Sequence, residues 1–185
     1  MSTLTLKELS HPAGEVIKIA AGKTLDLKSQ GSVTMPTGSV LQVKQAVLTS
    51  TISISSPANE TWQVLTGLEV SITPKSTASK FLVSFSVAVD TNNNYPIGLH
   101  IYRDSTKATP DGPVIEGLSS FITHQQSADT RDLGVQQNGS FLDSPNTAST
   151  VVYKIFGAKP AASTSVLNIN TLGGTSSITV QEIQG

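Results

Sequence analysis

Side chains that perform acid–base or nucleophilic chemistry are few in this sequence of 185 residues. The three histidines, His11, His100 and His124, stand among many serines and threonines. A Ser-His-Asp triad is defined by geometry, so these residue types alone indicate nothing specific. The sequence contains neither Gly-x-Ser-x-Gly nor Gly-x-x-x-x-Gly-Lys, the motifs that present a nucleophilic serine or hold a phosphate. We therefore predict no catalytic residues, and no enzyme.

Paired carboxylates are the alternative chemistry to consider, because glycosidases use two of them. Asp129, Asp132 and Asp143 are the candidates, and a small polysaccharide depolymerase is the less favoured reading. We prefer a polar loop at Asp129–Asp132. We interpret Asp143 as a turn residue that bonds its own backbone in Asp-Ser-Pro-Asn. One Trp and three Tyr leave few aromatic platforms for a sugar.

Metal and cofactor sites are not predicted either. Asp90-Thr-Asn-Asn-Asn94 offers the oxygen ligands that calcium prefers, but not the Asp-x-Asp-x-Asp-Gly spacing, and it is typical of a hairpin loop. A ring of His124 around a threefold axis is the other metal hypothesis, against the simpler interpretation of a solvated loop histidine. The chain has no cysteine, which excludes disulfides and thiolate ligands.

Aromatic residues suggest where a partner would bind. Trp62 is expected to be a buried anchor in the core or between subunits, with stacking on a host sugar as the alternative. A long polar loop is predicted from Leu118 to Asn138, and loops often carry recognition. The expected host-contact residues are Tyr95, Phe121, His124, Gln125 and Gln126. An ordinary surface loop is the equally weighted alternative.

Charge is sparse and balanced. There are 12 Lys and Arg against 13 Asp and Glu, giving a net charge of −1, and charged residues make up 14% of the chain, against about 25% in average proteins. A nucleic-acid partner would require a basic face, so none is predicted. No apolar run approaches the ~18 residues of a membrane span, so no membrane insertion is predicted. A polar chain with few charges suits contact with other protein surfaces.

Alternating apolar residues predict an all-β fold. In Lys80–Asp90 one face is entirely Phe and Val, whereas the other is small and partly apolar. Shorter alternating runs lie at Leu68–Ile72, Leu99–Ile101, Val151–Phe156, Leu167–Ile169 and Ile178–Val180. Pro74 ends the first of these, because proline donates no ladder hydrogen bond. Turn-forming residues separate the runs, which indicates an antiparallel sandwich or barrel over residues 41–185.

Residues 1–40 form a different region, predicted to be an extended β arm or stem. Short alternating pairs flank a predicted tight turn at Ala21-Gly22-Lys23. So few apolar residues cannot form an independent core, and the arm must pack on its own head domain, on copies of itself or on a partner. The residues expected to bury in trimerisation and attachment are Ile17, Ile19, Leu25, Leu27, Val33 and Met35.

Four segments, in the same order, resemble fibre-type virion structural proteins of tailed bacteriophages, especially marine phages and cyanophages. They are Gly31–Val47 at the stem-to-head junction, Thr66–Val83 and Gly139–Lys154 in the distal domain, and Ser176–Ile183 as its closing strand. Tail fibres and capsid decoration proteins of this kind are the members that the sequence is similar to. The resemblance covers most of residues 31–183.

The resemblance implies a homotrimer with a jelly-roll-like head on a narrow β stem, located in the virion. We expect a non-enzymatic, short fibre-type appendage on the tail or baseplate that contacts the host surface. The alternative is a capsid decoration, or cement, protein that stabilises the shell. The expected partners are copies of itself, then a tail or baseplate adaptor or the major capsid protein, and a host surface glycan or protein.

Overall fold

The computed structural model describes residues 21–22, 35–54, 62–91, 97–104, 120–122, 133–158 and 166–185. The chain divides into two compact units, Met1–Thr34 and Met35–Gly185. In the first unit, Ala21 and Gly22 form a turn in which Gly22 has a φ of +72°, which confirms the turn predicted there. The predicted role of residues 1–40 in attachment and trimerisation stays a prediction.

The described part of the second unit consists of strands and their connections, without a helix. The strands are β1 (Val40–Leu48), β2 (Ile52–Ile54), β3 (Gln63–Ile72), β4 (Lys80–Thr91), β5 (Ile97–Arg103), β6 (Ser120–Ile122), β7 (Leu133–Asp143), β8 (Val151–Ala158), β9 (Leu167–Ile169) and β10 (Ser176–Ile183). All of them pair antiparallel. The all-β antiparallel prediction is confirmed.

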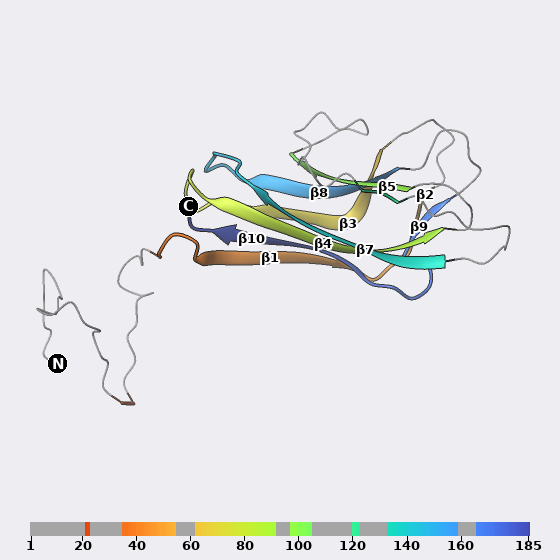
Figure 1. Cartoon of the computed structure of the whole chain (residues 1–185), viewed down its shortest axis with the longest axis horizontal. Coiled ribbons are helices and arrows are strands. Elements are labelled where there is room, and N and C mark those ends of the chain that lie inside the picture. The colour runs from red at the N-terminus through yellow and green to blue at the C-terminus, as the bar shows by residue number, and fades with distance from the viewer. Residues whose placement is uncertain are drawn as a thin grey trace, which may run out of the picture. The chain divides into compact units, whose positions relative to one another are not determined.

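These strands form two packed sheets (Figure 1). Sheet A has the order β1-β10-β4-β7, and the short pair β2-β9 continues β1 and β10 along the same side of β4. Sheet B has the order β3-β8-β5-β6. When β1 with β2 and β9 with β10 are each counted as one interrupted strand, the chain order of the eight strands is 1-8-3-6 and 2-7-4-5. Two four-stranded antiparallel sheets connected in this way form a jelly roll, as predicted.

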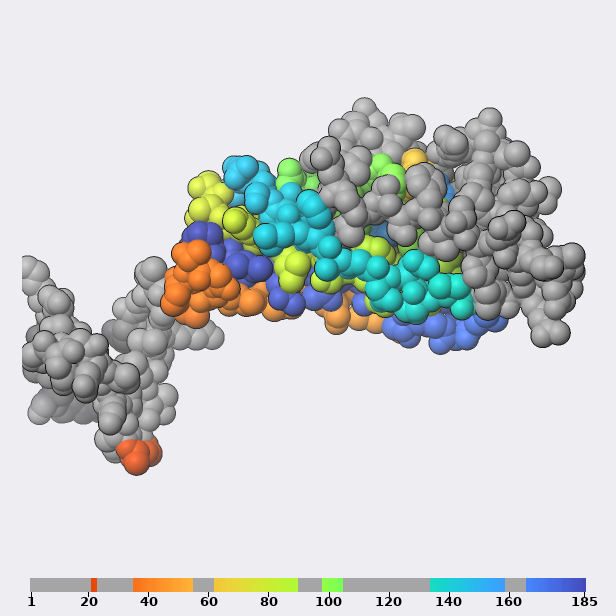
Figure 2. Space-filling model, viewed as in Figure 1, coloured from red at the N-terminus to blue at the C-terminus, as the bar shows by residue number. Residues whose placement is uncertain are grey.

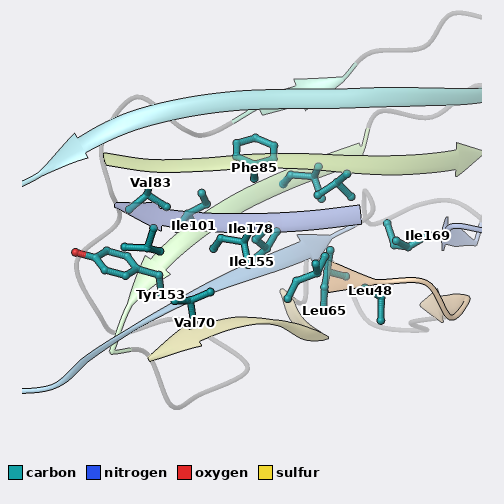
Figure 3. Close-up of a cluster of buried hydrophobic side chains, with 14 of the residues drawn as sticks. Leu48, Leu65, Val70, Val83, Phe85, Ile101, Tyr153, Ile155, Ile169 and Ile178 are labelled. Carbon is teal, nitrogen blue, oxygen red and sulfur yellow. The ribbon is translucent and has the colours of Figure 1, made fainter. Parts of the chain in front are cut away.

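The core lies between the sheets, where one face of every central strand is apolar (Figure 3). In β4 the residues Phe81, Val83, Phe85, Val87 and Val89 are all buried, whereas Leu82, Ser84 and Ser86 on the other face are half-buried. Strands β8 and β10 show the same alternation. Burying a side chain of this size contributes about 1.5–3 kcal/mol, so the period-2 pattern itself drives the sandwich together.

The pairing of β1 with β10 is separated from the pairing of β2 with β9 by a short interruption. The side chain of Asn170 hydrogen-bonds to the backbone at this interruption. Its side-chain amide donates to the carbonyls of Leu48 at 2.8 Å and Ser50 at 3.2 Å, and its Oδ1 accepts from Ser176 at 2.7 Å. The Ser176 hydroxyl in turn accepts from the Ala88 N–H at 3.0 Å. Asn170 is buried and has a φ of +61°, which asparagine tolerates better than most residues.

Strands β6 and β7 correct the predicted loop. Phe121 lies in β6, not in a loop, and residues from Leu133 onward belong to β7, which pairs with β4 along its whole length. The loop prediction failed here because β7 contains few apolar residues, and glycine and glutamine occupy positions on both of its faces. Such a strand at a sheet edge has little apolar area to bury, so its sequence looks like a loop.

Candidate interaction surface

The outer face of sheet A carries three successive rows without a charged side chain. Register across the four strands defines three rows on this face: Val43-Gln181-Leu82-Leu142, Gln45-Thr179-Ser84-Ser140 and Val47-Ser177-Ser86-Asn138. Hydroxyl and amide groups pair within it, as in Gln45 Nε2 to Thr179 Oγ1 at 2.9 Å and Gln136 Nε2 to Ser86 Oγ at 2.6 Å. Lys80 lies one row beyond, opposite Ile183.

Strand β1 carries an exposed apolar stripe along one edge of this face. Val40, Val43 and Val47 are 49%, 56% and 53% exposed, and Met35 just before the strand is 40% exposed. A β-bulge between Val40 and Gln42 places Val40 opposite Ile183, on the same outer face as Val43. We call Met35, Val40, Val43 and Val47 the β1 stripe. In Figure 2 the strands of sheet A form adjoining bands, with β1 in orange and β7 in cyan.

The outer face of sheet B is different, because it holds an aromatic cluster. Trp62 stacks on His100 with ring centroids 3.8 Å apart, His100 Nδ1 lies 3.1 Å from the Tyr102 hydroxyl, and Tyr102 meets Phe156 edge-on at 5.1 Å. Burial lowers the pKa of His100 and raises that of Tyr102. Trp62 is half-buried on this outer face, so the expected core position is wrong, and a role between subunits stays a prediction.

Asp143 connects the two sheets at the end of β7. Its carboxylate accepts from Arg103 Nη1 in β5 and, at 2.7 Å, from the hydroxyl of Tyr153 in β8. Burial and the hydrogen bond to Asp143 raise the pKa of Tyr153 well above its usual range, and the pKa of Arg103 is raised by its hydrogen bond and charge pairing with Asp143 against a lowering by burial. The interpretation of Asp143 as a turn residue bonded to its own backbone is wrong, because the register places it beside two donors from sheet B.

A second carboxylate lies in the same register row. Glu182 pairs with Phe81, as Asp143 does from the other side. Glu182 is buried and accepts from the Lys75 N–H at 2.5 Å, the Ser79 hydroxyl at 2.6 Å and Gln42 Nε2 at 2.5 Å. Both carboxylates are thus occupied by structural donors that close this end of the sandwich. Sequence reasoning missed both roles, because the donors come from distant segments.

The predicted site residues fall mainly outside the described residues. This holds for Ile17, Ile19, Leu25, Leu27, Val33, Tyr95, His124, Gln125 and Gln126. Met35 is described and exposed. The β1 valines were not predicted as site residues, because the polar Gln45 separates Val43 from Val47 and Val40 reaches their face only through the bulge.

The described residues hold neither a metal-binding cluster nor a membrane-spanning helix. They contain no group of three or more His, Cys, Asp or Glu residues placed to hold a metal ion. No helix among them is long and apolar enough to cross a membrane.

Comparison with known proteins gives structural likeness only. No protein-family model and no curated protein sequence matches the chain. Among solved structures, VP2 of infectious bursal disease virus in a subviral particle is 12% identical with a TM-score of 0.48, and the structure of the Gx strain of that virus is 11% identical, also at 0.48. Each match covers 88% of this chain but only 38% and 37% of the other. The proposals below therefore depend on the residues of this chain.

Proposed function

We propose that this chain is a non-enzymatic structural protein of a tailed-phage virion, built as a homotrimeric short appendage on the tail or baseplate that contacts the host surface. The β1 stripe packs around the threefold axis, and residues 1–40 extend the contact and attach the trimer to an adaptor. Jelly rolls serve widely as virion building blocks, and the sequence resemblance points to the same class.

The β1 stripe is the observation that carries this proposal. Val40, Val43 and Val47, at 49–56% exposure, lie along one edge of the outer face of sheet A, and Met35 at 40% exposure precedes them in sequence. Exposed apolar groups of this kind mark protein contacts. The partner is a further copy, because three identical stripes meet without opposing like charges. The predicted apolar residues of the arm, including Val33, precede the stripe directly in sequence.

Light scattering coupled to size-exclusion chromatography of the full chain tests the assembly. The wild type is expected at three times the chain mass of 19.3 kDa, or at a multiple of that trimer mass where trimers associate further. Val43→Asp is expected to shift the mass toward one chain, because three buried carboxylates would repel each other near the axis. Ile19→Asp is expected to impair the trimer while the head stays folded.

Ser71→Asp is the matched control, because Ser71 is also exposed on a strand but lies on β3 of sheet B. It is expected to leave the mass unchanged. A monomeric wild type, or a trimer that withstands both Val43→Asp and Ile19→Asp, would overturn the proposed assembly.

Electron cryomicroscopy of the purified particle tests the location. A few copies at the tail support the appendage, whereas many copies over the shell contradict it and support a decoration protein. Absence of the chain from the particle would contradict both.

A further inference from the structure

The four outermost strands of the sandwich differ in how their free edges are protected. An edge strand exposes unpaired N–H and C=O groups, and natural proteins block such edges with bulges, charges, proline or short length. Strand β1 has a bulge and carries Lys44 opposite the core residue Val180. Strand β3 is broken by a register shift around Gly67, whose φ is +95°, and β6 has three residues.

Strand β7 has none of these devices. It has eleven residues, and its register with β4 runs without a shift from Leu133 to Asp143. The segment Leu133–Leu142 contains no charged residue and no proline. Within the described residues, β7 pairs with β4 alone. In Figure 1, β7 follows β4 as a long, regular strand.

We propose that the edge of β7 pairs antiparallel with β7 of a second copy, around a twofold axis at Asn138. In this register Gln136 faces Ser140, Gln137 faces Gly139, and Gly134 faces Leu142. Each glycine thus lies opposite a longer side chain. On the core side, Val135 faces Phe141, a β-branched and aromatic pair of the kind that stabilises sheets.

A second copy fits this edge better than an unrelated strand, because the segment is complementary to itself. Reversing Gly134–Leu142 about Asn138 keeps the outward residues outward, since all paired positions have the same parity. No like charges face each other in the pair. A twofold contact also uses both β7 edges of the pair at once, so neither of these two edges stays unprotected, and between trimers the contact would join one trimer to the next.

This contact is independent of the proposed trimer, because β1 and β7 are opposite edges of sheet A. Cysteine cross-linking tests it in the full chain, which has no native cysteine. Opposed residues in an antiparallel pair have Cα atoms about 4.5–5.5 Å apart, within the range of a disulfide. Asn138→Cys is therefore expected to form a covalent dimer under mild oxidation, resolved by non-reducing gel electrophoresis.

The register is tested by mixing variants. Gln136→Cys and Ser140→Cys are each expected to remain uncross-linked alone, because their own symmetry mates lie about 13 Å apart along the strands. An equimolar mixture of the two is expected to cross-link, since Gln136 faces Ser140. All three positions are exposed on the outer face, so thermal melting followed by circular dichroism is expected to match the wild type.

Ser71→Cys serves as the collision control, because Ser71 is exposed on another strand. The proposal is overturned if Asn138→Cys cross-links no faster than Ser71→Cys at equal concentration. It is also overturned if Gln136→Cys alone cross-links as fast as its mixture with Ser140→Cys. Because no residue of the β1 stripe is changed, failure here leaves the trimer test unaffected.

Discussion

Strands β1 and β7 form the two edges of the same sheet but differ in construction. Strand β1 begins with a bulge, carries Lys44 and stops at Leu48, after which β2 resumes the pairing. Strand β7 is regular and uncharged up to Asp143. A bulge and a lysine prevent strand addition at β1, which leaves its valines available for a contact between side chains. At β7 the backbone itself remains available.

The β1 and β7 edges of sheet A are also stabilised by different interactions. The β1 side depends on hydrogen bonds from uncharged amide donors, from Asn170 at the interruption and from Gln42 to the Glu182 carboxylate at the end. The β7 side ends on the ion pair of Asp143 with Arg103. Edge strands in one sheet can thus be specialised for different contacts without any change in the core between them.

The largest loss of stability is expected from Asn170→Ala, which removes the hydrogen bonds at the interruption between β1 and β2. It removes the donors to the Leu48 and Ser50 carbonyls and the acceptor for Ser176. Buried polar groups left unpaired cost about 1–3 kcal/mol each, and alanine at a φ of +61° adds about 1 kcal/mol. We expect a loss of about 4 kcal/mol or more in the free energy of unfolding, measured by urea denaturation.

Two further variants separate the contribution of the backbone conformation of Asn170 to the free energy of unfolding from that of its side-chain hydrogen bonds. Asn146 also has a positive φ, of +53°, but is exposed, so Asn146→Ala is expected to lose only about 1 kcal/mol. Asn170→Gly relieves the backbone strain but not the lost hydrogen bonds, and should stay close to Asn170→Ala. Equal losses for Asn170→Ala and Asn146→Ala would contradict the role assigned to the side chain.

The next effect concerns the end of β7. Asp143→Asn leaves Arg103 without its charge partner, and we expect it to cost about 2 kcal/mol. Tyr153→Phe removes one neutral donor from the same carboxylate, for about 1 kcal/mol. Figure 3 shows the Tyr153 hydroxyl at the edge of the core cluster, pointing away from the apolar side chains.

Tyr153 also predicts a pH dependence. Its folded pKa is raised above the ordinary value of 10.0 by burial and by its bond to Asp143. The unfolded chain therefore releases this proton first, so the stability from Tyr153 is complete below about pH 10 and is lost as the pH rises further. The stability gap between wild type and Tyr153→Phe should stay constant up to about pH 10 and narrow above it, and a constant gap above about pH 10 would show that Tyr153 does not titrate in this way.

Much of the fold could be predicted from the sequence, because a strand with one buried face shows a period-2 alternation of apolar and polar residues. The faces of β4 and β10 were visible in the sequence, as was the end of β3 before Pro74. Strand β7 was not, because neither of its faces is strongly apolar. Its pairing depends on the edge that β4 offers, which is a property of the assembled sheet.

The candidate surface could be predicted much less well. Val40 joins the β1 stripe only through the bulge at Leu41, which no residue type in the sequence indicates. The partners of Asp143 come from β5 and β8, about 40 and 10 residues away. An aspartate before Ser-Pro-Asn is typical of a turn residue. Only the tertiary contacts of Asp143 show that this interpretation is wrong.

The smallest effect is expected from exchanging the edge protection. Lys44→Thr removes the exposed lysine from β1, and Gln136→Lys adds one to β7. Surface changes of this kind alter stability by about 0.5 kcal/mol or less, so the readout is association. Sedimentation velocity over a range of concentrations should show more association for Lys44→Thr and less for Gln136→Lys than for the wild type. Lys75→Thr, which removes the same charge from an exposed position just after Pro74, should match the wild type. If Lys44→Thr and Lys75→Thr behave alike, net charge rather than edge protection governs the association at β1.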